Sequence, residues 1–141
     1  MEIMAIIPAR GGSKGIPLKN LKLLDGKPLI DYSVNGSLKS KFITRTIVSS
    51  DHPKILKRAE KLGAEIIKRP KILATDSSQL EPVMEHCLNH FKLKENYIPD
   101  IVILLQNTSP LRTKDHIDDA LSTFLDSKYD SMMSCYSSHY F

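Results

Sequence analysis

Short apolar runs, separated by segments with helical periodicity, constrain the fold of this chain more than any other feature of its sequence. Each run has the length of a strand, and the runs lie at residues 3–7, 45–50, 64–68, 101–105 and 131–135. The run at 101–105 is apolar at every position, so a strand formed from it has no polar face. Strands of this kind belong to parallel sheets that helices cover on both faces. The sequence therefore predicts an α/β fold with a mostly parallel central sheet.

Helical patterns fill the segments between these runs. Residues 29–38 form one candidate helix, and the next candidate carries Ile55, Ala59 and Leu62 on its apolar face. Two further apolar stripes follow at offsets of three and four residues: Leu80, Val83, Met84, Cys87, Leu88 and Phe91, and then Ile117, Ala120, Leu121, Phe124 and Leu125. Because residues at these offsets share one face of a helix, we expect both stripes to pack on the sheet.

Length and charge limit the classes of protein that fit. A chain of 141 residues is long enough for one domain with an ordinary core, so we predict a single domain over residues 1–141. The formal charge of +4 is spread along the chain, which favours anionic ligands but lacks the clustered basic surface of a nucleic-acid-binding protein. We therefore expect no nucleic-acid partner.

The cysteines and the apolar start of the chain bear on its cellular compartment. Cys87 and Cys135 lie far apart in apolar patterns, without a CxxC motif, which predicts reduced and buried thiols. The apolar start is short, follows Glu2 and ends at Pro8, so it matches neither a signal peptide nor a membrane span. We expect a cytoplasmic protein without a membrane partner.

A basic, glycine-rich loop at residues 8–20 directly follows the first apolar run. Its cations are Arg10, Lys14 and Lys19. The backbone N–H groups of a glycine turn form a concave anion site, to which Arg adds bidentate oxygen recognition and Lys adds a mobile charge. The spacing of the glycines fits neither the Walker loop nor the dinucleotide fingerprint, and a solvated turn is the alternative interpretation. Our hypothesis is that this loop binds a polyphosphate.

Polar segments also follow the later predicted strands. Ser49, Ser50 and Asp51 end the second run, Arg69 follows the third, and residues 106–110 follow the fourth. Ligands of open α/β sheets bind at the carboxyl ends of the strands, so we expect these segments to meet the glycine-rich loop. The candidate site lies at this edge of the sheet.

Residues 7–20, Ile-Pro-Ala-Arg-Gly-Gly-Ser-Lys-Gly-Ile-Pro-Leu-Lys-Asn, resemble the amino-terminal signature of the acylneuraminate cytidylyltransferases, also called CMP-N-acetylneuraminic acid synthetases. Segments 47–51, 69–70, 73–76 and 104–112 are similar to later blocks of that family, in the same order. The resemblance implies a Rossmann-like three-layer sandwich of the nucleotide-diphospho-sugar transferase type. It also implies transfer of CMP from CTP to a sialic acid-type nine-carbon α-keto acid sugar, with release of pyrophosphate.

The resemblance assigns roles to the residues at matching positions. Arg10 and Lys19 would be catalytic, because they would hold the triphosphate while charge accumulates on its phosphoryl oxygens. Gln106 would face the acceptor sugar. The remaining positions would bind the nucleotide: Ala9, Gly11, Gly12, Ser13, Lys14, Asn20, Arg69 and Ser78.

Within that set, Asn20 would reach the ribose, and Arg69 and Ser78 would lie on the cytosine side. Structural interpretations stay open for Arg69 as a surface charge at a strand end, for Ser78 as a helix cap and for Gln106 as a loop residue. Asn107 stands where proline is more usual in the sialic acid group, a departure that concerns the sugar pocket.

Mg²⁺ is the cofactor that the resemblance implies. Asp51 and Asp76 are the best-placed acidic residues, but neither has a second carboxylate at a suitable spacing, so we predict no complete metal site in this chain. The chain resembles the amino-terminal part of the family, truncated before an excursion through which family members form homodimers. Two alternatives stay open: a half-domain that binds CTP or CDP without turnover, and a cytidylyltransferase for Kdo, legionaminic or pseudaminic acid.

Overall fold

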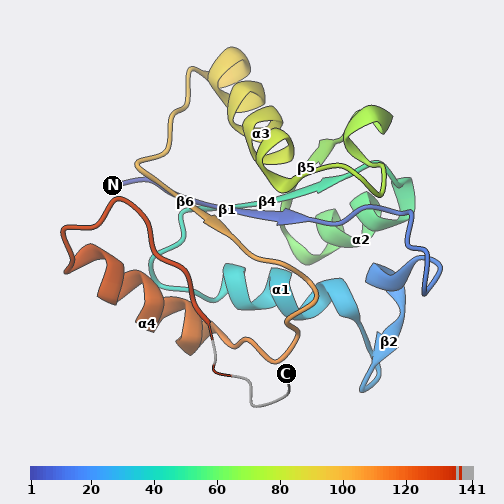
Figure 1. Cartoon of the computed structure of the whole chain (residues 1–141), viewed down its shortest axis with the longest axis horizontal. Coiled ribbons are helices and arrows are strands. Elements are labelled where there is room, and N and C mark those ends of the chain that lie inside the picture. The colour runs from blue at the N-terminus through green and yellow to red at the C-terminus, as the bar shows by residue number, and fades with distance from the viewer. Residues whose placement is uncertain (136, 138–141) are drawn as a thin grey trace.

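The computed structural model describes residues 1–135 and 137, and its centre is a parallel sheet (Figure 1). The strands are β1 (Ile3–Pro8), β4 (Arg45–Ser50), β5 (Glu65–Lys68) and β6 (Ile101–Leu104), in the order β5-β4-β1-β6. β1 pairs in parallel with β4 and with β6, and β4 pairs in parallel with β5. The carboxyl ends of these strands therefore lie at one edge of the sheet, which confirms the expected architecture.

Helices cover both faces of this sheet (Figure 1). The helices are α1 (Leu29–Leu38), α2 (Pro53–Leu62), α3 (Leu80–Glu95) and α4 (Lys114–Leu125). Ile30 of α1, Ile55 of α2 and Ile117 of α4 belong to one core cluster, whereas Cys87 and Phe91 of α3 belong to another. The three-layer sandwich is thus built from α1, α2 and α4 on one face and α3 on the other.

The side chains of β1 alternate between these two cores. Ile3, Ala5 and Ile7 pack under α1, α2 and α4, whereas Met4 and Ile6 pack under α3. None of these residues is exposed to solvent. Full burial of one large aliphatic side chain stabilises a fold by about 1.5–3 kcal/mol. The glycine-rich loop therefore leaves the sheet from a strand that is buried on both faces.

Local sequence signals set the ends of α2, which begins beside the site. His52 is the N-cap, and its Nδ1 accepts a hydrogen bond from the Lys54 backbone N–H at 3.2 Å. Pro53 occupies the first helical position, where its missing N–H leaves no carbonyl unpaired. Gly63 ends the helix with a φ of 99°, which glycine adopts without strain.

A short hairpin precedes α1 and was not among the expected elements. β2 (Leu23–Leu24) pairs antiparallel with β3 (Lys27–Pro28). Asp25 and Gly26 between them have φ values of 48° and 74°. Positive φ at both central residues is typical of the type I′ turn, for which Asp-Gly is a favoured sequence. That dipeptide was a usable signal for this hairpin.

The strand expected at residues 131–135 is wrong. These residues form neither strand nor helix, and all of them are exposed. A strand is stable only when it pairs and buries a face, and this short run, Ser-Met-Met-Ser-Cys, has only three apolar residues to bury. Cys135 is consequently exposed, which contradicts the expectation of two buried thiols, whereas Cys87 is buried as expected.

Helix length also bears on membrane association. The longest helix in the described part of the chain is α3, with 16 residues, whereas a membrane span needs about 20 apolar residues. Within residues 1–135, no helix combines the length and the apolar character that crossing a membrane requires.

Candidate functional site

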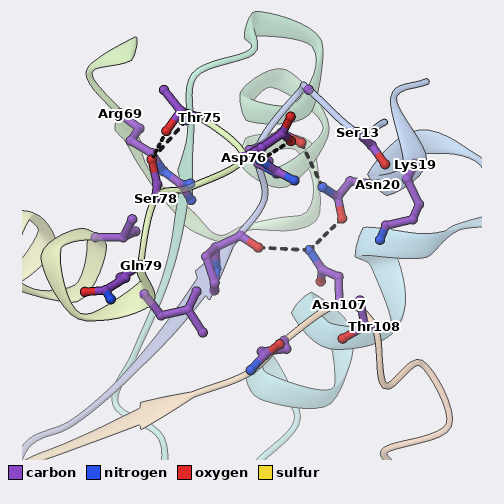
Figure 2. Close-up of a pocket in the computed structure, with 16 residues that line it drawn as sticks. Ser13, Lys19, Asn20, Arg69, Thr75, Asp76, Ser78, Gln79, Asn107 and Thr108 are labelled. Atoms are coloured by element: carbon purple, nitrogen blue, oxygen red, sulfur yellow. Dashed lines mark hydrogen bonds and ion pairs between the residues drawn. The ribbon is translucent and has the colours of Figure 1, made fainter. Parts of the chain in front are cut away.

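A cavity of about 310 Å³ opens at the carboxyl edge of the sheet, where the loops after β1, β5 and β6 meet (Figure 2). Its walls come from segments far apart in the sequence. The lining residues are Pro8, Arg10, Gly12, Ser13, Lys19, Asn20, Arg69, Thr75, Asp76, Ser78, Gln79, Leu80, Val83, Gln106, Asn107 and Thr108. Most of the site residues expected from the sequence are in this set, whereas Ala9, Gly11 and Lys14 are not.

Residues 9–20 of the glycine-rich loop are called the phosphate loop here, after the ligand that the sequence predicts for it. Two of its cations, Arg10 and Lys14, pair with the loop that follows β5. Arg10 Nη1 lies 2.8 Å from Asp76 Oδ1, and Lys14 Nζ lies 3.2 Å from Asp76 Oδ2. Lys14 and then Arg10 lower the pKa of the Asp76 carboxyl below its ordinary value. Asp76 thus occupies the charges that a phosphate group would otherwise engage. This pairing ties the two sides of the cavity together.

The glycines of the phosphate loop serve different purposes. The Gly11 N–H donates a hydrogen bond to Asp51 Oδ1 at 2.8 Å. A Cβ added at Gly11 would lie 2.7 Å from the His52 Cβ, so only glycine fits against the start of α2. Gly12 lines the cavity, and a Cβ there would meet no atom within 4 Å. Close packing requires glycine at position 11, whereas position 12 has open space.

Ala9 lies behind the cavity wall. It is 1% exposed, and its N–H donates a hydrogen bond to the Ser49 carbonyl at 2.9 Å. Ala9 thereby joins the start of the phosphate loop to the end of β4. Its backbone hydrogen bond holds the start of the loop in position.

The end of the phosphate loop turns Lys19 and Asn20 inward through the 3₁₀ turn η1 (Lys19–Leu21). Leu18, just before it, has a left-handed φ of 49°. Asn20 is buried, and its Nδ2 donates a hydrogen bond to the Arg10 carbonyl at 3.0 Å. Within residues 1–135, no ion pair joins Lys19 to a carboxylate. Its ammonium therefore provides a positive charge on the wall opposite Arg69 (Figure 2).

Arg69 follows β5 and is only 5% exposed, so the surface-charge interpretation is wrong. Its Nε donates to Ser49 Oγ at 3.1 Å, and its Nη2 donates to the Ser49 carbonyl at 2.8 Å. Burial lowers the pKa of the Arg69 guanidinium, because a charge is less stable away from water. These hydrogen bonds orient the group, and it contributes a positive charge to the cavity wall.

Ser78 closes the loop between β5 and α3, a loop that begins with the 3₁₀ turn η2 (Lys71–Leu73). Its Oγ accepts a hydrogen bond from the Thr75 N–H at 3.0 Å and donates to the Ile72 carbonyl at 3.3 Å. The N-cap of α3 is Gln79, so the interpretation of Ser78 as that cap is wrong. Ser78 lines the cavity near Arg69 (Figure 2).

The loop after β6 forms the third wall. Gln106 is exposed and lines the cavity, and its carbonyl accepts a hydrogen bond from Arg112 Nη2 at 3.0 Å. The neighbouring Asn107 is buried, and its Nδ2 donates to Asn20 Oδ1 at 3.0 Å. The walls after β1 and β6 are therefore joined by a pair of side-chain amides.

Several lining residues were missing from the expected site: Thr75, Asp76, Gln79, Asn107 and Thr108. Asp76 and Asn107 lay inside sequence blocks that pointed to the site, but nothing in the sequence indicated their partners. The ion pairs of Asp76 and the amide contact of Asn107 join segments that meet only in three dimensions.

Comparison with known proteins agrees with this geometry. A family model described as Cytidylyltransferase matches residues 4–139. N-acylneuraminate cytidylyltransferase A of Danio rerio is 37% identical over 99% of this chain and 31% of its own length. Pseudaminic acid cytidylyltransferase of Campylobacter jejuni is 38% identical over 89% of this chain and 54% of its own length. The chain thus spans about a third of one relative and about half of the other.

A solved structure shows the same fold. The structure titled CMP:2-keto-3-deoxy-manno-octonic acid synthetase complexed with CTP superposes with a TM-score of 0.71. It is 23% identical, and the match covers 89% of this chain and 48% of that one. Since the family model covers nearly all of the sequence and the relatives share more than a third of their aligned residues with it, this chain belongs to the cytidylyltransferase family.

Proposed function

We propose that this chain binds CTP in the cavity at the carboxyl edge of the sheet and forms the nucleotide half of an acylneuraminate cytidylyltransferase. The reaction joins the anomeric hydroxyl oxygen of an acidic α-keto sugar to the α-phosphorus of CTP. The bond between the α-phosphorus and the bridging oxygen of pyrophosphate breaks. The products are the CMP-sugar and pyrophosphate.

The observation that carries the proposal is the convergence of Arg10, Lys19 and Arg69 on one cavity, whose other lining residues are mostly polar. Negative charge develops on phosphoryl oxygens during the transfer, and fixed cations stabilise it without further reorganisation. In this proposal Arg10 and Lys19 hold the triphosphate. Asn20 contacts the ribose, and Arg69 and Ser78 lie on the cytosine side.

The acceptor sugar is proposed to lie beside Gln106, which is exposed at the mouth of the cavity. Names of relatives support an acidic nine-carbon sugar, since one is named for N-acylneuraminate and another for pseudaminic acid. The identities of 37% and 38% are too similar to separate these sugars. We propose a sialic acid-type substrate, with legionaminic and pseudaminic acids as the competing acceptors in the test.

Mg²⁺ is the cofactor that we propose for the complete reaction, although the residues here do not fit a full metal site. Asp76 is the carboxylate among the lining residues, and both of its oxygens are engaged by Arg10 and Lys14. Within residues 1–135 and 137, no group of three His, Cys, Asp or Glu residues could hold a metal ion. Mg²⁺ requires several oxygen ligands, and the lining residues do not provide them. The steps proposed for this chain are therefore assigned to its own side chains.

Calorimetric titration of the chain with CTP, CDP, ATP and GTP, with and without Mg²⁺, tests nucleotide binding. We expect selective binding of the cytidine nucleotides. Because each charge-assisted hydrogen bond contributes about 1.5–3 kcal/mol, Arg10→Ala and Lys19→Ala should each weaken CTP binding by roughly tenfold or more. Lys57→Ala, on an exposed position of α2, is the matched control. Equal affinity for all four nucleotides would contradict the proposal.

Turnover requires a separate assay. Release of pyrophosphate from CTP should depend on an added nine-carbon α-keto acid sugar, and the sugar that gives the highest kcat/KM identifies the acceptor. CTP binding without pyrophosphate release from any of these sugars would support the alternative of a nucleotide-binding half-domain.

A cytoplasmic homodimer completes the proposal. The free thiols of Cys87 and Cys135 suit a reducing compartment, in which disulfides are rare. The homodimer rests on the resemblance to the acylneuraminate cytidylyltransferases. Light scattering during size-exclusion chromatography measures the mass directly, and a monomer at all concentrations would contradict the dimer.

A further inference from the structure

Asn107 lies where the loop after β6 meets the phosphate loop (Figure 2). It lines the cavity, yet only 4% of the residue is exposed. Its Nδ2 donates a hydrogen bond to Asn20 Oδ1 at 3.0 Å and contacts the Pro8 carbonyl at 3.5 Å. The side chain thus connects two loops that leave neighbouring strands of the sheet.

Backbone carbonyls determine the direction of these hydrogen bonds, because a carbonyl oxygen can only accept. Asn20 turns its Nδ2 to the Arg10 carbonyl, so its Oδ1 faces Asn107. Asn107 must then present its own Nδ2, and the Pro8 carbonyl favours the same orientation. A single directed chain runs from the Asn107 amide through the Asn20 amide to the backbone of Arg10.

This orientation has a cost. Oδ1 of Asn107 is buried and has no hydrogen-bond partner within the part of the chain that the structure describes. A buried acceptor without a partner destabilises a fold, and in native structures such groups are rare. Leucine has the same branched shape and no unpaired polar atom, but it cannot donate a hydrogen bond to Asn20. The amide at position 107 therefore provides a donor that an apolar side chain would lack.

We propose that Asn107 is a positioning residue of the nucleotide site, which orients the Asn20 amide toward the ribose of a bound cytidine nucleotide. The inference rests on the proposed function, in which Asn20 contacts the ribose. Asn107 holds Oδ1 of Asn20, and the Arg10 carbonyl holds one Nδ2 hydrogen. The second Nδ2 hydrogen of Asn20 is left for a ribose hydroxyl. Without Asn107, only the Arg10 carbonyl holds the Asn20 amide, and the direction of this second hydrogen is less fixed.

The test compares the affinities for CTP, 2′-deoxy-CTP and 3′-deoxy-CTP, measured by calorimetry on the whole chain. The wild-type chain should bind CTP roughly tenfold more tightly than the analogue that lacks the contacted hydroxyl, as expected for one buried hydrogen bond. Asn107→Asp preserves the size of the side chain but turns an acceptor toward Asn20 Oδ1. Asn107→Asp and Asn107→Ala should therefore reduce the ratio to less than about threefold.

Two further variants make the result specific. Asn20→Ala combined with Asn107→Ala should bind CTP no more weakly than Asn20→Ala alone, because Asn107 acts through Asn20. Leu111→Ala, at an exposed position in the same loop, should keep the wild-type ratio. Thermal unfolding of each variant verifies that it is folded at the temperature of the titration.

Three outcomes would overturn the positioning role. Equal weakening of CTP and of both analogues by the Asn107 variants would indicate a general structural effect, and additive losses for Asn20→Ala and Asn107→Ala would exclude action through Asn20. A wild-type chain that binds CTP but does not discriminate against either analogue would also contradict it. In each of these cases the proposed binding of CTP in the cavity survives. If the wild-type chain binds no cytidine nucleotide, both the proposed function and this inference fail.

Discussion

At the scale of single residues, Asp76 occupies the cations that the proposed function assigns to the phosphates of CTP. Its carboxylate pairs with Arg10 and Lys14, and these pairs lower its pKa. A lowered carboxyl pKa means that the ion pairs are present throughout the neutral range. They are lost only as the pH falls through the lowered pKa. In the proposed complex with CTP near neutral pH, the triphosphate would displace the Asp76 carboxylate from Arg10.

Asp76→Asn should tighten the binding of pyrophosphate several-fold, because the competing negative charge is removed while the size of the side chain is kept. The ratio between wild type and variant should stay constant over the neutral range, since Asp76 remains ionised there. Titration calorimetry with pyrophosphate measures both effects. Asp119→Asn, an exposed change of equal charge on α4, is the control. Weaker pyrophosphate binding by the Asp76 variant would show that this carboxylate supports the site.

Gly11 and Gly12 form a matched pair for a second test. A Cβ at position 11 collides with His52, whereas a Cβ at position 12 meets open space. Gly11→Ala should therefore lower the free energy of unfolding by about 1–3 kcal/mol, and Gly12→Ala should change it by less than about 0.5 kcal/mol. Urea denaturation of both variants measures these changes in the free energy of unfolding. Equal effects at the two positions would mean that the phosphate loop adjusts freely against α2.

The glycines also show what the sequence pattern does not predict about single residues. The pattern in the sequence indicated a phosphate loop but did not separate the glycine that packs against His52 from the glycine that lines the cavity. That difference depends on where α2 begins relative to the loop. The sequence around the glycines does not predict the contact between Gly11 and His52, because His52 lies in a different segment of the chain.

At the scale of elements, an ion pair joins α1 to α2. Arg58 on α2 donates through Nε to Asp31 Oδ1 on α1 at 2.9 Å, and its Nη2 contacts Asp31 Oδ2. The carboxylate is buried, whereas the guanidinium is about a third exposed. Hydrogen bonding to Asp31 raises the pKa of the Arg58 guanidinium. The pair therefore fixes two helices that lie on the same face of the sheet.

Arg58→Ala should lower the free energy of unfolding by about 1–3 kcal/mol, because it leaves the Asp31 carboxylate buried and unpaired. Partial exposure of Arg58 keeps the expected loss below that of a fully buried pair. Lys57→Ala, one position earlier on the exposed face, should change stability by less than about 0.5 kcal/mol. Chemical denaturation of both variants tests this, and a loss of equal size in the two would contradict the assigned role.

The periodicity of apolar residues in the sequence predicted the helices and strands that are long or apolar on both faces. The four helices and the strands β1, β4, β5 and β6 lie where the sequence predicted them. The exceptions are short: the β2–β3 hairpin, and residues 131–135, which form no strand. A run with few apolar residues becomes a strand only if a neighbour pairs with it, and pairing is a property of the tertiary structure.

At the scale of the whole molecule, the reactivity of the two cysteine thiols depends on whether the chain is folded. Burial raises the pKa of the Cys87 thiol, although Ser49 and Arg69 act in the opposite direction. Cys135 is exposed. Because the thiolate is the reactive form and must also be accessible, the two thiols should differ in reactivity.

Cys135 should react with a thiol reagent within minutes at neutral pH, whereas Cys87 should react only as the chain unfolds. Mass spectrometry after timed labelling would show one modification in the native chain and two in denaturant. Cys135→Ser removes the fast phase and serves as the control. Rapid labelling of Cys87 in native buffer would show that the core between α3 and the sheet opens easily.

The sequence by itself determined the sandwich, the edge of the sheet at which the cavity opens, and half of the residues that line the cavity. It could do so because burial of apolar strands and helical stripes is encoded locally, and parallel strands place their carboxyl ends together. The tertiary structure decided the contacts between segments: Asp76 on Arg10 and Lys14, and Asn107 on Asn20. It also buried Arg69 against Ser49. Such contacts depend on side-chain positions at the meeting of separate loops, which no local pattern specifies.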